Sequence, residues 1–333
     1  MNAVMQKLLR AFEAGSTSFT HILVGNEGYE SVKFDLANYH AIVPKAAPIA
    51  FVDSGNAELA SGPNFALHFI RTCAIVRGKK PIIEEAFCLV QATSQNGKLV
   101  YVTDLIGIEG IRLPTIDLYE PTLAEGTHRV QPSKVAELVR TLAELRLASW
   151  LVPELPNNTL LVRDGDLQAH TIFEQNAYRE LYERARIQGV TIAGLSKTST
   201  LLTNAGHSAI TALMELAPPT AWNYHPIATS TKPDHQASVA ITKLHPRSHY
   251  AFRLDIHDQH LPFLPELVNA LAAESTDAAF LGYPYGLIEA DRYAKVRNDE
   301  KGYLRLKAEM ALGKKLEQQE TGSTAHDALN KAT

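Results

Sequence analysis

The segment that most constrains the fold is residues 159–167, TLLVRDGDL, where a short apolar run leads into Arg163 and then Asp164. An apolar run of this length that ends in turn residues predicts a buried strand. Ligands of open α/β sheets bind beyond the carboxyl ends of such strands, so Asp164 is a candidate reacting or metal-binding group. Asp-Gly is also ordinary turn chemistry, and the assignment therefore depends on what accompanies it elsewhere in the chain.

Acidic residues occupy three further positions that fit with this one. The segment PIAFVDSGN, residues 48–56, is predicted as a second strand, and its apolar part runs into Asp53. Apolar residues with a period of 3.6 predict a helix over residues 133–151, and this helix carries Glu144, with Glu137 as the alternative acid. Asp291 lies on the last predicted helix.

The order of the predicted elements is typical of an α/β fold with a mixed sheet and helices on its faces. The strands expected to form an antiparallel meander lie at 48–56, 65–76, 85–92 and 98–105, the last two joined by an Asn96-Gly97 hairpin. A strand at 159–163, a helix at 172–188 and a strand at 190–195 predict a βαβ crossover. The other predicted elements are a helix at 3–14, Ser133 as N-cap, strands at 237–243, 249–255 and 279–282, and helices at 265–273 and from Gly286.

The formal net charge of the 333 residues is −4, so the chain as a whole does not attract nucleic acid. Binding of nucleic acid therefore requires a local basic patch. Cys73 and Cys88 lie in apolar contexts and are interpreted as core residues in a reducing compartment. Neither a signal peptide nor a membrane span is predicted, which favours the cytoplasm and no membrane partner. We expect an N-terminal arm over 1–45, one main domain over 46–312 and a polar, disordered tail over 313–333.

Acids on the first strand, on the helix after the meander, on the strand after that helix and on the last helix form the layout of ribonuclease-H-like nucleases. Phosphodiester cleavage of that kind uses two divalent cations about 3.5 to 4 Å apart. Mg²⁺ and Mn²⁺ prefer oxygen ligands, so convergent carboxylates suit them. The pattern therefore predicts a ribonuclease-H-like mixed sheet, with an inserted region before the last helix.

Five blocks, VDSGN, AELRLA, LLVRDGDL, AGLSKTS and GYPYGLIEADRYAKV, resemble the NurA nucleases in order and spacing. The resemblance spans about residues 48 to 300, and its most specific block is the Tyr-Pro-Tyr segment followed by a helix-borne acid. It implies a ribonuclease-H-like, Mn²⁺- or Mg²⁺-dependent deoxyribonuclease with two ions. It also implies a homodimer that acts on DNA with a hexameric HerA-type ATPase in end processing and double-strand break repair, as a 5′-3′ exonuclease, an endonuclease or both.

The resemblance also implies the site residues. Asp53 and Asp164 would bind metal, Glu144 would be the helix-borne acid, and Asp291 stands where many family members have histidine. The chain departs from the family in a second place, because the usual Asp-Gly-Ser is Asp53-Ser54-Gly55.

Four further residues are candidates for contact with DNA. Lys197 follows a buried strand and suits a phosphate contact, with an exposed loop lysine as the alternative. Tyr283 and Tyr285 either stack on bases or pack the last helix against the sheet. Arg292 opens a locally basic stretch that extends to Lys315.

Three alternatives are weighed against this hypothesis. One is an RNA-directed or structure-specific nuclease on the same fold. Another is a catalytically weak adaptor that binds DNA and regulates an ATPase partner. The third, a zinc site among the six histidines between His225 and His260, is disfavoured because no cysteine joins them. A Walker-type loop is missing from the sequence, so ATP hydrolysis is not expected.

Overall fold

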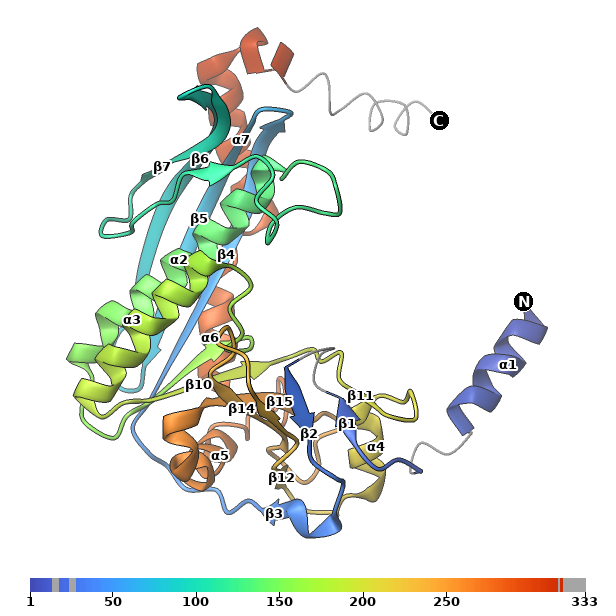
Figure 1. Ribbon diagram of the computed structural model, residues 1–333. Helices are drawn as coiled ribbons and strands as arrows, with labels where there is room; N and C mark the ends of the chain where they lie inside the picture. The colour runs from blue at the N-terminus through green and yellow to red at the C-terminus, as the bar shows by residue number, and fades with distance from the viewer. Residues whose placement is uncertain (14–17, 24–27, 317, 320–333) are drawn as a thin grey trace. The chain divides into compact units, whose positions relative to one another are not determined.

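The structure is a computed structural model, and it describes residues 1–13, 18–23, 28–316 and 318–319 (Figure 1). Its architecture is mixed α/β, with a large mixed sheet flanked by helices. The chain divides into two compact units. The first comprises Met1–Ala50, Pro156–Gln168 and Gly189–Ile288, and the second comprises Phe51–Leu155, Ala169–Gln188 and Glu289–Thr333.

An antiparallel meander forms the sheet of the second unit, as predicted. Its strands follow one another in chain order: β4 (Ile49–Gly62), β5 (Phe65–Val76), β6 (Ile82–Gln95), β7 (Lys98–Ile106) and β8 (Ile116–Asp117). The turn between β6 and β7 has positive φ at both Asn96 (51°) and Gly97 (77°), which is the backbone that a two-residue hairpin requires. The predicted Asn-Gly hairpin is therefore confirmed.

Helices cover both faces of this meander. Helix α2 (Pro132–Leu151) lies over β5 and β6, and α3 (Ile172–Gln188) packs beside α2 (Figure 1). Ile70 on β5 joins the apolar core beneath α2, whereas its neighbour Arg71 pairs with Glu300 of α7 (Asn298–Leu312). Successive strand residues point to opposite faces, so α7 covers the face that α2 leaves open.

The start of α2 differs from the prediction. The N-cap is Gln131, not Ser133, because Pro132 occupies the first helical position, where its fixed φ and missing N–H are tolerated. The Ser133 hydroxyl instead donates to Glu58 Oε2 at 2.5 Å. The prediction of a helix here is confirmed, but that of its cap is wrong.

The predicted βαβ crossover is present, with both of its strands in the first unit and its helix α3 in the second. Strands β9 (Leu160–Asp164) and β10 (Thr191–Ser196) are parallel and are joined through α3. Antiparallel strands continue from β10 in the order β15 (Phe252–His257), β14 (Ala237–Lys243), β12 (Trp222–Tyr224) and β3 (Tyr39–Ala41). The full strand order of the sheet is β3-β12-β14-β15-β10-β9-β4-β5-β6-β7-β8.

The remaining elements are short. They are α1 (Asn2–Glu13), β1 (Ile22–Leu23), β2 (Tyr29–Ser31), β11 (Leu202–Thr203), α4 (Ala209–Leu216), β13 (Ala228–Ser230), α5 (Leu264–Ala273), α6 (Tyr285–Ala294), and the 3₁₀ turns η1 (Leu36–Asn38), η2 (Val152–Glu154) and η3 (Asp258–Phe263). Strands β1 and β11 form one small sheet, and β2 and β13 form another.

Three predicted strands require correction. The strand expected at 48–56, with turn residues from Asp53, is β4 and runs without a turn to Gly62. The strand expected at 249–255 is β15, Phe252–His257. The strand expected at 279–282 is a pair of turns, since the Gly282 N–H donates to the Ser275 carbonyl and φ of Gly282 is +95°. The segment predicted as an arm contains α1 and the short strands β1, β2 and β3. Most of the predicted tail lies outside the described residues. The predicted boundaries of the arm, the main domain and the tail therefore stay predictions.

Within the described ranges, no helix combines the length and apolar character needed to cross a bilayer.

Candidate active site

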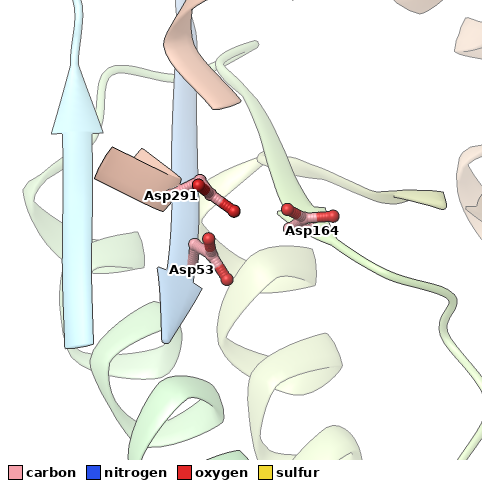
Figure 2. A group of neighbouring side chains, drawn as sticks. All are labelled: Asp53, Asp164 and Asp291. Carbon is pink, nitrogen blue, oxygen red and sulfur yellow. The ribbon is translucent and has the colours of Figure 1, made fainter. Parts of the chain in front are cut away.

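Three carboxylates that are far apart in the sequence lie together in the structure (Figure 2). Asp53 comes from β4, Asp164 from the end of β9 and Asp291 from α6. Each offers one carboxylate oxygen, and the three oxygens lie within 4.8 Å of one another. Among the residues that the structure describes, this is the one group of three or more His, Cys, Asp or Glu side chains arranged to hold a metal ion.

The local sequence explains the position of Asp53. The four residues before it on β4, Ile49 to Val52, are all buried, as expected of a strand covered on both faces. Asp53 is itself only 9% exposed, and its Oδ1 accepts a hydrogen bond from the Ser54 N–H at 2.7 Å. The strand thus carries a carboxylate to a largely desolvated place, where a nearby cation would stabilise its charge.

Asp164 has a partner on each carboxylate oxygen. The Lys197 Nζ lies 2.6 Å from Oδ2, and the Tyr283 hydroxyl donates to Oδ1 at 3.4 Å. The Lys197 ammonium also lies 5.6 Å from the centre of the Tyr283 ring. Two of the predicted phosphate- or DNA-binding residues therefore contact a predicted metal ligand directly.

The Tyr283 ring is packed inside the protein. Tyr283 is 1% exposed, and its ring centre lies 5.1 Å from that of Phe252 and 5.5 Å from that of Phe280. This arrangement corresponds to the packing alternative for Tyr283, with the hydroxyl turned toward Asp164. Tyr285 is the first residue of α6, and its N–H donates to the Glu274 carbonyl at 2.8 Å.

Glu144 is buried next to the residue that follows Asp53. It is 1% exposed, it accepts a short hydrogen bond from the Ser54 hydroxyl, and its Oε2 lies 3.4 Å from Arg140 Nη1. The structure places it outside the group of three aspartates. The alternative acid, Glu137, is exposed and pairs with Lys134 at 3.0 Å. Of the two helix-borne acids, Glu144 is the one near the site.

The reversed Ser54-Gly55 order has a physical reason. A Cβ atom at Gly55 would lie 2.4 Å from the carbonyl oxygen of Ala294, the last residue of α6. Real Cβ atoms essentially never come that close to another heavy atom. Glycine at position 55 therefore lets α6, which carries Asp291, approach β4, which carries Asp53.

Arg292 follows Asp291 and lies on the surface. Its side chain is 62% exposed, with Nη2 at 3.8 Å from Glu289 and its guanidinium 5.0 Å from the centre of the Tyr293 ring. It lines a cavity of about 610 Å³ together with Lys295 and Arg297. Glu85, Asp299 and Glu300 line the same cavity, so its lining carries both charges, and the exposed Arg292 is accessible to a polyanion.

Three of the six histidines in the region from His225 to His260 are buried, namely His235, His257 and His260. Burial lowers the pKa of both His257 and His260 to about 4, so both are neutral at pH 7. His260 Nδ1 accepts the Ile192 N–H at 3.1 Å, which ties η3 to β10.

Sequence reasoning missed a buried charged cluster on β15. Asp255 is fully buried and accepts hydrogen bonds from Arg253, His235 and the Leu167 N–H. The one sequence signal was the i, i+2 spacing of Arg253 and Asp255 on a predicted strand, which places both on one face.

Comparison with solved structures finds a similar fold. The crystal structure of the NurA nuclease from Sulfolobus solfataricus matches with a TM-score of 0.51 and 12% identity, covering 84% of this chain and 89% of that one. Endonuclease V from Ciona intestinalis (TM-score 0.36, 9% identity, 88% and 97% covered) and Argonaute from Kluyveromyces polysporus (TM-score 0.33, 14% identity, 80% and 28% covered) are more distant. A search of curated proteins gave no match.

The family model for the NurA domain matches residues 48–296 of the chain, which is most of its length. The predicted mixed sheet flanked by helices is confirmed by the observed architecture, and the Sulfolobus NurA nuclease has a similar fold. The chain belongs to the NurA family.

Proposed function

We propose that this protein is a DNA nuclease that depends on divalent Mn²⁺ or Mg²⁺ held by Asp53, Asp164 and Asp291. The observation that carries the proposal is the convergence of three carboxylate oxygens within 4.8 Å on a chain of the NurA family. Carboxylates this close repel one another when ionised, and a bound cation offsets that repulsion.

The donor set fits such an ion. All three groups are hard oxygen donors, and the group contains neither a thiolate nor an imidazole, which softer metals favour. When bound, a pair of divalent ions would activate a water molecule and neutralise the oxygen that leaves the phosphodiester. Glu144, held between Ser54 and Arg140, is the proposed fourth acid.

The other residues would position the nucleic acid and the ligands. Lys197, whose ammonium contacts Asp164 Oδ2, is placed to meet a phosphate that approaches the carboxylates. Tyr283 orients Asp164 through its hydroxyl. Arg292 on the surface of α6 would contact the DNA backbone, and Tyr285 at the start of α6 is proposed as a further DNA contact.

The cellular role is proposed from family membership. We expect a cytoplasmic homodimer that works with a HerA-type hexameric ATPase in DNA end processing and double-strand break repair. Light scattering behind size-exclusion chromatography measures the oligomeric state. Co-elution with a HerA-type ATPase measures the partnership.

The activity is tested on linear single- and double-stranded DNA labelled at one end, with Mn²⁺, Mg²⁺ or EDTA. We expect metal-dependent loss of label. The labelled end that is lost first shows whether cleavage runs 5′-3′, and labelled fragments of intermediate length show endonucleolytic cleavage. Asp164→Asn should lower the rate by roughly a thousandfold, since it removes a metal-binding charge. The matched control is Asp104→Asn, at an exposed aspartate on β7.

Undiminished cleavage by a folded Asp164→Asn variant would overturn the assignment of the site. Absence of cleavage by the unaltered protein, with and without a HerA-type ATPase, would favour the adaptor alternative.

A further inference from the structure

The chain turns back on itself directly after Asp164. Gly165 has φ of +114°, a conformation that favours glycine, and its N–H donates to the Leu195 carbonyl at 3.0 Å. The turn then passes over Gly194 of β10, where a Cβ atom would lie 2.4 Å from the Gly165 carbonyl oxygen. Two glycines thus allow residues 165–167 to lie against the sheet.

This turn lies on the face of the sheet opposite to the Asp164 side chain. In the strand register, Arg163 of β9 is beside Gly194 of β10, and Gly194 is beside Asp255 of β15. Neighbouring residues in register share a face, so Arg163, Gly194 and Asp255 share the face onto which the turn folds. Asp164, one residue later than Arg163, points to the other face.

Charged groups on that face hold the turn. The Asp255 Oδ2 accepts the Leu167 N–H at 3.1 Å, and Arg163 Nη1 donates to the Asp166 carbonyl at 2.8 Å. Arg253 Nη1 lies 3.7 Å from the Asp166 carboxylate. The backbone after Asp164 is therefore fixed at two successive residues, at Asp166 by the Arg163 guanidinium and at Leu167 by the buried Asp255 carboxylate, and Arg253 contacts the Asp166 side chain.

Asp255 is in turn held by its own partners. Arg253 donates to it through Nε at 2.7 Å and Nη2 at 2.8 Å, and His235 Nε2 lies 2.8 Å away. Burial alone would raise the pKa of Asp255, but the hydrogen bond from His235 and the charge of Arg253 outweigh it and lower the pKa to about 2. The network extends to β2, where the Tyr29 hydroxyl lies 2.9 Å from His235 Nδ1.

We propose that Tyr29, His235, Arg253 and Asp255 are positioning residues that fix the turn after Asp164 and thereby aim its carboxylate at the metal. This inference rests on the proposed metal-dependent nuclease. It assigns a role in the site to a side chain from β2, near the N-terminus, and to strands that carry none of the three aspartates.

The test compares His235→Gln and Tyr29→Phe with the unaltered protein and with His128→Gln, a variant at an exposed histidine in the loop before α2. Tyr29→Phe removes only one hydroxyl, so it keeps the test valid if His235→Gln fails to fold. Three quantities are measured: Mn²⁺ affinity by electron paramagnetic resonance, amide hydrogen exchange over residues 165–168, and kcat and KM for DNA.

Loss of an outer partner of a metal ligand typically weakens metal binding or activity by about 10- to 100-fold. We expect His235→Gln to weaken Mn²⁺ binding by about tenfold, to speed exchange in the turn, and to lower kcat with KM for DNA unchanged. Tyr29→Phe should act in the same direction with a smaller effect, and His128→Gln should have none.

Folded variants with unaltered Mn²⁺ affinity and unaltered exchange would overturn the inference. If the unaltered protein itself bound no Mn²⁺, the proposed function would fail separately. Exchange over residues 165–168 would then decide whether the network fixes the turn, since that measurement needs no metal.

Discussion

Gly55→Ala is the substitution whose effect follows most directly from the structure. The added methyl group would point at the end of α6, where the Ala294 carbonyl oxygen would be 2.4 Å from it and the carbonyl carbon 3.1 Å. Both neighbours are backbone atoms, which cannot rotate away as a flexible side chain can. Either α6 or β4 must move.

The size of the movement can be worked from these distances. Ordinary contacts of a Cβ atom begin near 3.4 Å, so relief of the 2.4 Å contact requires a shift of about 1 Å. Asp291 lies one helical turn before Ala294, and its carbonyl accepts the Lys295 N–H at 2.8 Å, so the shift reaches Asp291 through the helix. A misplacement of 1 Å can cost on the order of a hundredfold in rate, and overpacking costs about 1 to 3 kcal/mol of stability.

The assay pairs Gly55→Ala with Gly302→Ala. Gly302 lies inside α7, and a Cβ atom there would meet open space. Alanine at position 302 should stabilise the protein by about 0.5 to 1 kcal/mol, because glycine loses more backbone entropy in a helix. Mn²⁺ affinity, DNA cleavage and urea unfolding are measured for both variants.

We expect Gly55→Ala to fold, to bind Mn²⁺ more weakly and to cleave DNA about a hundredfold more slowly. If it bound Mn²⁺ and cleaved DNA as the unaltered protein does, the close approach of α6 would not set the position of Asp291. Equal losses in Gly302→Ala would show that the assay reports general damage.

Two further predictions concern pH and a lysine. Burial lowers the pKa of His257 and His260 to about 4 in the folded protein, below the roughly 6.5 of the unfolded chain. A depressed histidine pKa means that protons bind the unfolded chain better, so stability should fall by a few kcal/mol as pH drops from about 6.5 to 4. Urea unfolding at several pH values measures this dependence of stability on pH. If the double variant His257→Gln, His260→Gln showed the same dependence, these two histidines would not be its cause. Lys197→Met should tighten Mn²⁺ binding, because the ammonium 2.6 Å from Asp164 Oδ2 no longer competes with the ion; weaker binding in a titration would refute this.

Local chemistry in the sequence determined most of the elements. Residues 65–76, 172–188 and 237–243 were predicted from the periodicity of apolar residues, and they coincide with β5, α3 and β14. The strand that ends at Asp164 was identified from its apolar run, whereas the strand predicted to run into a turn at Asp53 continues to Gly62. Periodicity works here because a residue's burial is set by the face of its own helix or strand.

The errors arose where a contact between distant residues decides the conformation. The turns at 279–282 bring Gly282 against Ser248, whose hydroxyl oxygen would lie 2.4 Å from a Cβ at position 282, and the position of Ser133 depends on its bond to Glu58. Neither partner is visible in a local window of sequence. Family resemblance supplied the site residues, but not which of them contact one another.

Local sequence alone predicted a mixed sheet with acidic residues directly after apolar strand segments and on two helices. The tertiary structure alone decided that Asp53, Asp164 and Asp291 converge, and that Glu144 meets Ser54 and Arg140. It also placed Asp255 behind the turn after Asp164. The reason is physical: periodicity fixes the face on which a side chain lies, whereas the distance between two side chains depends on strand register and on close backbone approaches at Gly55 and Gly194.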